Sequence, residues 1–144
     1  MINDRQRVQS IASEVIGWMR DQVADPKAKV MPYMPLLVQG WDAGTDTILR
    51  SAPCLVVAMA PSGDRNGMVD LTLALCYLEL TAPLYGLGTC WAGLLQAALM
   101  SIPELRQQMG IPADHPFYYP MMIGYANTHY YRLPQRKAPR IAWK

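Results

Sequence analysis

The chain has few side chains with which to bind a metal ion or to form a disulfide network. It holds two histidines, His115 and His129, and three cysteines, Cys54, Cys76 and Cys90, and none of these has the spacing of metal ligands. The cysteines are odd in number and widely spaced, and no signal peptide precedes them. We therefore expect no metal site, no disulfide framework and a location in the reducing cytoplasm.

Charged residues are also scarce, at 17% of the chain, and the net charge is only +2. So small a positive excess argues against a nucleic-acid partner. The basic residues are unevenly placed, because residues 127–144 contain no acidic side chain. This proline-punctuated stretch predicts an extended basic tail that lies along another surface. Its basic residues are Arg132, Arg136, Lys137, Arg140 and Lys144.

Long unbroken hydrophobic runs are few. Leu80–Pro103 is uncharged, but Pro83, several glycines and Gln96 interrupt it, so we expect a soluble protein without a membrane span. The length of 144 residues suits one domain with a real core. The hydrophobic fraction of 51% is typical either of an oligomer or of a protein with a single large core.

Apolar residues at helical spacing follow Asp4 and stop before Asp25-Pro26. This pattern predicts an amphipathic first helix. A second long helix is predicted over Gly67–Tyr85, and because this stretch is apolar nearly all round, we expect it to be buried on most sides. Shorter helices are expected between Pro35 and Trp41, over Leu94–Met100, and from Pro103 to Gly110.

Short apolar runs between turn residues predict the strands. Cys54–Ala60 lies between a proline and "PSGDRNG", which indicates a buried strand. "HPFYYPMMIGY" predicts a second strand, in which Pro120 indicates an edge position or a bulge. "TCWAG" predicts a short strand or an extended loop. A few short strands among five helices indicate an α+β domain in which helices predominate.

The joint "GLGTCWAGLL", residues 86–95, permits two interpretations. In the structural one, Gly86 ends the long helix, Gly88 makes a turn and Trp91 fills the core. In the functional one, the amides of Thr89 to Leu94 form one wall of a flat ligand site, and Gly93 allows a ring to lie against the backbone.

Several motifs resemble one known family. "GLGTCWAG", "PELRQQMGIP" and "MMIGYANTHYYRLPQRKAPRIAW" are similar to the C-terminal part of the nitroreductase flavoenzymes, above all the branch often fused to a ferredoxin-type domain. "GWDAGTDTILRSAPCLVVAMAP" also resembles that branch, and the similarity runs from about Trp18 to Trp143. The resemblance implies a nitroreductase-like α+β fold, with helices around a small, mostly antiparallel sheet.

The same resemblance implies a cytoplasmic homodimer with FMN at the subunit interface. NAD(P)H or a ferredoxin-type donor would reduce the flavin, and hydride would pass through its N5 atom to a small nitroaromatic, quinone or similar acceptor. The matching positions imply that the FMN ring lies beside Trp91, Ala92, Gly93 and Leu94. They also imply that Arg136, with Lys137 next to it, meets the phosphate. No residue is assigned as a catalytic acid or base.

The sequence departs from the family pattern at its N-terminus. The Arg-Ser-rich segment that grips the phosphate and the Asn and Gln-Pro segment that contacts the ring have no counterpart here. "MINDRQRV" resembles the end of the first strand entering the first helix. Residues 1–144 are therefore expected to form a truncated single domain with 127–144 as its tail. A flavin-free dimerisation or binding module, or an inactive fragment, remains the alternative function.

Overall fold

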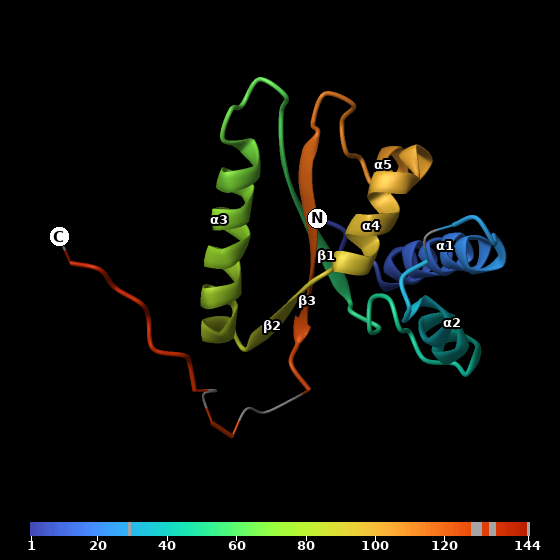
Figure 1. Cartoon of the computed structure of the whole chain (residues 1–144), viewed down its shortest axis with the longest axis horizontal. Helices are drawn as coiled ribbons and strands as arrows, with labels where there is room; N and C mark the ends of the chain where they lie inside the picture. Colours follow the sequence, from blue (N-terminus) through green and yellow to red (C-terminus); the bar gives the residue numbers. More distant parts are fainter. Residues whose placement is uncertain (29, 128–130, 133–134, 144) are drawn as a thin grey trace.

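Helices cover both faces of a small sheet. The computed structural model describes residues 1–28, 30–127, 131–132 and 135–143. Helix α3 lies against one face of the sheet, while α1 and α4 pack on the other face, with α2 and α5 beside them (Figure 1). The elements are α1 (Arg5–Ala24), α2 (Met34–Asp42), β1 (Cys54–Ala60), α3 (Gly67–Thr81), the 3-10 helix η1 (Ala82–Tyr85), β2 (Leu87–Trp91), α4 (Gly93–Ser101), α5 (Pro103–Gln108) and β3 (Phe117–Tyr125). The expected α+β class is confirmed.

The first helix follows the pattern that predicted it. The Asp4 carboxylate caps α1 by accepting hydrogen bonds from the amides of Gln6 and Arg7, at 2.9 and 3.2 Å. One face of α1 is buried in the core, and its buried residues are Val8, Ile11, Ala12, Val15, Ile16 and Met19. The helix ends at Ala24, directly before Asp25-Pro26, as expected.

The sheet is antiparallel throughout and has the order β1-β3-β2. β3 is therefore the central strand, and the expectation that Pro120 marks an edge or a bulge is wrong. Pro120 pairs with Val57 of β1, whereas the last β2 residue, Trp91, pairs with Met121. The carbonyl oxygen of Pro120 accepts from Ala92, so its backbone faces the β2 side. Pro120 has no N–H to donate toward β2. Because β2 ends at Trp91, the β2–β3 ladder loses no hydrogen bond at this position.

The N-terminal residues lie along the outer edge of β1. Ile2 forms an antiparallel bridge with Leu55, whose amide donates to the Ile2 carbonyl at 2.9 Å and whose carbonyl accepts from the Ile2 amide at 2.8 Å. The chain then turns at Asp4 into α1. This agrees with the expectation that "MIND" is extended chain leading into the first helix.

Helix α3 is less buried than its composition predicted. Gly67, Leu71 and Leu75 face the sheet, and Leu71 and Leu75 belong to the smaller core cluster with Ala60 and Met121. The opposite face is apolar but exposed: Val69 is 58% exposed, Leu73 62%, Tyr77 71%, Leu80 77% and, in η1, Leu84 82%. The expectation of burial on most sides is therefore wrong for the single chain, because one sheet face covers only one side of a helix.

The helical stretch Gly67–Tyr85 also has the length and composition of a membrane span. Its mean hydropathy is 1.3, and 22% of the apolar window is buried. The sequence prediction of no membrane span concerned Leu80–Pro103, which overlaps only the last part of this stretch. Because Leu71 and Leu75 of this helix pack on the sheet, the exposed apolar face is only part of its surface.

After β3 the chain leaves the body of the molecule. The described tail residues form no helix or strand and are exposed, with Tyr131 at 100% and Trp143 at 89%. Figure 1 shows the tail running from the end of β3 past the end of α3 and outward. The described part of the tail thus has no regular secondary structure.

Candidate functional site

The glycine joint connects η1, β2 and α4. Gly86 has a φ of 69° and its amide donates to the Pro83 carbonyl at 3.1 Å, so it ends the helical stretch as the structural interpretation required. At Gly88 a Cβ would lie 3.0 Å from the Cβ of Ala126, which shows a close approach to the chain after β3. Gly88 lies within β2, so the expectation that it makes a turn is wrong.

The start of α4 presents free backbone donors. Ala92 is 2% exposed, and its amide is occupied by the carbonyl of Pro120 at 3.0 Å. Ala92 is also the N-cap of α4 and provides no side-chain cap. The amides of the first turn, at Gly93, Leu94 and the next residue, therefore have no acceptor within the helix and carry its positive partial charge. This end suits the electron-rich edge of a ligand.

Gly93 leaves the approach to these amides open. It is exposed, and the nearest atom to a Cβ built there is the hydroxyl of Tyr119 at 3.5 Å. A flat ring can come within contact distance of such a backbone. Gly93 and Leu94 are thus the members of the expected wall that offer both donors and space.

Trp91 and Tyr119 form an aromatic pair beside this turn. Their ring centroids are 5.2 Å apart and their planes meet at 72°, an edge-to-face arrangement. The indole Nε1 of Trp91 donates to the Glu79 carboxylate of α3 at 3.0 Å. No pattern in the sequence predicted this contact, which joins a helix and a strand. The signal that could have found it is the acid Glu79 among the apolar residues of the last turn of α3.

A cavity of about 530 Å³ opens next to β2. Its lining includes the charged side chains of Arg50 and Glu79 and the exposed thiol of Cys90. Arg50 and Ser51 both have left-handed backbone conformations, with φ of 54° and 57°. The Asp46 carboxylate holds this strained turn by accepting from the Ser51 amide at 2.8 Å. No sequence pattern indicates these positive φ angles, since neither residue is a glycine.

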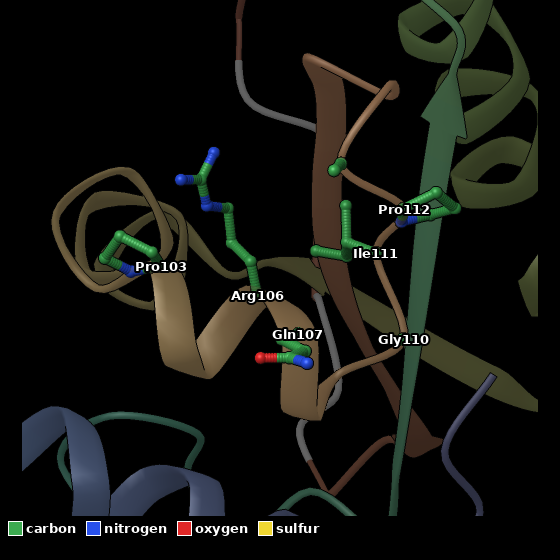
Figure 2. A pocket seen from close by; sticks show the side chains of 7 residues that line it. Pro103, Arg106, Gln107, Gly110, Ile111 and Pro112 are labelled. Carbon is green, nitrogen blue, oxygen red and sulfur yellow. The ribbon is translucent and has the colours of Figure 1, made fainter.

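Another cavity, of about 570 Å³, lies away from the joint at α5 and the turn that follows it (Figure 2). Arg106 and Gln107 extend from α5 in different directions, and Ile111 and Pro112 line the opposite side. No residue of the expected site lines this cavity. Its side chains do not converge on one point, so it lacks the character of an active site.

The basic tail residues are separated from the joint. Arg136 and Lys137 are exposed in the extended tail, which leaves the body beyond α3 (Figure 1). No hydrogen bond or ion pair joins Arg136 or Lys137 to another described residue. His129 and Lys144, which belong to the same tail, lie outside the described residues.

The remaining ionisable candidates have local roles. His115 Nδ1 lies 2.8 Å from the Asp114 carboxylate, and this hydrogen bond lowers the pKa of Asp114. Burial raises the pKa of the Cys54 thiol, which makes it a poor nucleophile. Among the described residues, no three His, Cys, Asp or Glu side chains form a group that could hold a metal ion.

Comparison with known proteins connects this geometry to one family. The family model described as "Nitroreductase family" matches residues 3–125. A nitroreductase with bound FMN from Bacteroides fragilis NCTC 9343 superposes with a TM-score of 0.72 at 19% identity, over 98% of this chain and 72% of that chain. A nitroreductase with bound FMN from Desulfitobacterium hafniense DCB-2 gives 0.64 and 18%, over 93% and 69%. No curated protein sequence matches the chain.

Proposed function

The chain belongs to the nitroreductase family, and from this premise we propose that it is an FMN-dependent NAD(P)H oxidoreductase. The acceptor would be a small nitroaromatic, a quinone or a similar molecule. The observation that carries the proposal is the open turn at Gly93, where free amides of α4 lie beside an aromatic pair.

The residues at this turn fit one edge of a flavin. Gly93 has no side chain to keep a ring away, and the amides of Gly93 and Leu94 can donate to ring acceptor atoms. Trp91 and Ala92 hold the turn, the first through Glu79 and the second through Pro120. When bound, FMN would supply the hydride chemistry of the proposed reduction. The protein's own part is to orient the ring and to keep water from one side.

A phosphate site needs basic side chains, and the residues of the Gly93 turn include none. Arg136 and Lys137 are the basic residues that would meet the phosphate, and they lie in the exposed tail. A tail that extends away from its own body suits a contact with a second copy. We therefore place the complete site at the interface of a homodimer.

The exposed face of α3 supports that homodimer. Its apolar side chains follow one another at helical spacing, and a second copy of the same face is complementary to it in the isologous way of two-fold dimers. A cytoplasmic location and a ferredoxin-type donor in place of NAD(P)H also belong to the proposal. A flavin-free dimerisation module is the second candidate, because burial of the α3 face needs no cofactor.

Flavin release tests the proposal directly. The chain is purified with added FMN, freed of unbound flavin and denatured, and the released fluorescence is measured per chain. An FMN oxidoreductase gives bound flavin together with NAD(P)H-dependent reduction of a nitroaromatic or quinone. A dimer that binds no flavin at any concentration would instead support the flavin-free module.

A further inference from the structure

Glu79 lies on α3 at the boundary between the face that packs on the sheet and the exposed apolar face. It lies one turn after Leu75, which is 2% exposed, and next to Leu80, which is 77% exposed. Among the described residues it forms no ion pair, and the hydrogen bond that it accepts from Trp91 Nε1, at 3.0 Å, crosses from α3 to β2. Glu79 therefore ties the helix with the exposed apolar face to the strand that enters the Gly93 turn.

The orientation of Trp91 affects the turn directly. Trp91 is the last residue of β2, and two residues later α4 begins at Gly93. The Trp91 ring packs edge to face on Tyr119, and the Tyr119 hydroxyl lies next to Gly93. A rotation of the indole would move Tyr119 and with it the space in front of the free amides.

We propose that Glu79 is a positioning residue of the flavin site. By accepting from Trp91 Nε1, it fixes the indole and Tyr119, and so holds the Gly93 turn in the shape that receives the ring. The inference rests on the proposed function for its ligand, but the positioning itself is a property of the free protein. A hydrogen bond to a carboxylate is strong enough for this task.

The free protein offers the first readout. The four tryptophans of the chain give separate indole N–H signals in a proton–nitrogen NMR spectrum, and Trp91→Phe identifies the signal of Trp91. Glu79→Leu is expected to shift that signal upfield and to shift the amide signals of Gly93 and Leu94. Glu79→Gln keeps an acceptor oxygen and should leave the Gly93 and Leu94 amides near their original positions.

FMN affinity, measured by quenching of flavin fluorescence, is the second readout. Glu79→Leu and Trp91→Phe are each expected to weaken binding by about tenfold, and the double variant should be no weaker than either single one. Asp70→Leu, which removes the other acid of α3, is the matched control and should change neither the spectra nor the affinity. Equal melting temperatures separate positioning from a loss of folding, and Glu79→Gln tests the idea if the leucine variant does not fold.

The outcomes separate this inference from the proposed function. Unchanged Gly93 and Leu94 signals in Glu79→Leu would overturn the positioning role, whether or not FMN binds. A loss in Glu79→Gln as large as in Glu79→Leu would also overturn it, because charge rather than the hydrogen bond would then matter. If the wild-type protein binds no FMN while the NMR shifts occur as expected, the proposed function fails and the positioning of the turn stands.

Discussion

The amide of Ala92 donates to the carbonyl oxygen of Pro120 at 3.0 Å, one residue beyond the last pair of β2 and β3. This contact anchors the point at which β2 turns into α4. Since Ala92 is thereby occupied, the donors offered to a ligand are those of Gly93 and Leu94.

A side chain at position 93 should block flavin without unfolding the protein. Gly93→Val fills the space in front of the first turn of α4, so we expect FMN affinity to fall by more than about a hundredfold. Gly93→Ala places one methyl group at ordinary contact distance, 3.5 Å, from the Tyr119 hydroxyl and should cost far less affinity. Fluorescence titration with FMN measures both. Equal affinity in the valine variant and the wild type would mean that the ring lies elsewhere.

Replacing two helical glycines by alanine should change the free energy of unfolding in opposite directions. At Gly67 a Cβ would lie 2.6 Å from Cδ2 of Phe117 and 2.9 Å from Cβ of Ala60, so Gly67→Ala should destabilise the fold by about 1–3 kcal/mol. Gly17 in α1 is exposed with no atom within 4 Å of its Cβ position, so Gly17→Ala should stabilise by about 0.5–1 kcal/mol. Urea unfolding followed by circular dichroism gives both values. A Gly67→Ala variant that is as stable as the wild type would contradict the packing of α3 on the sheet.

Charges on the exposed face of α3 should prevent dimer formation. Leu73 and Leu80 are 62% and 77% exposed, and the double change to glutamate would bury repelling charges in the proposed interface. Light scattering should give twice the chain mass of 16.1 kDa for the wild type and the single mass for the variant. Leu36→Glu, on α2 and 67% exposed, is the control and should remain dimeric. A wild-type protein that is monomeric at micromolar concentration rules out this interface.

One basic residue of the tail should dominate phosphate binding. If Arg136 pairs with the FMN phosphate, Arg136→Ala loses a charge-assisted hydrogen bond of about 1.5–3 kcal/mol, which weakens FMN by about ten- to a hundredfold. Lys144→Ala should have little effect. The comparison is made by titration at constant ionic strength. Equal losses from both changes would indicate a diffuse positive field in place of a specific contact.

Local signals predicted much of the fold. Asp4, the apolar spacing after it and Asp25-Pro26 fix α1 through interactions within a few residues of each other, so its bounds could be predicted. The same holds for β1, whose run Cys54–Ala60 matched its prediction. The motifs around Gly93 also indicated the nitroreductase family, which the family match over residues 3–125 confirms.

Other features depend on which elements meet in space. The central strand tolerates Pro120 because β2 ends one pair earlier. No local pattern in the sequence specifies this register. The strained pair Arg50 and Ser51 exists because Asp46 holds that turn, and neither side chain indicates a positive φ. The contact between Glu79 and Trp91 joins residues twelve positions apart across a helix and a strand.

The sequence by itself determined the α+β class, the α1 and β1 segments, and the end of the long helical stretch at Gly86. These follow from spacing, capping and backbone freedom, which act over a few residues. Only the tertiary structure decided which face of α3 is covered. The composition of α3 predicts a helix that is apolar nearly all round. The sheet buries only the helix face that carries Leu71 and Leu75. The opposite face, from Val69 to Leu84, stays exposed because burial depends on the partner surface as much as on the side chain.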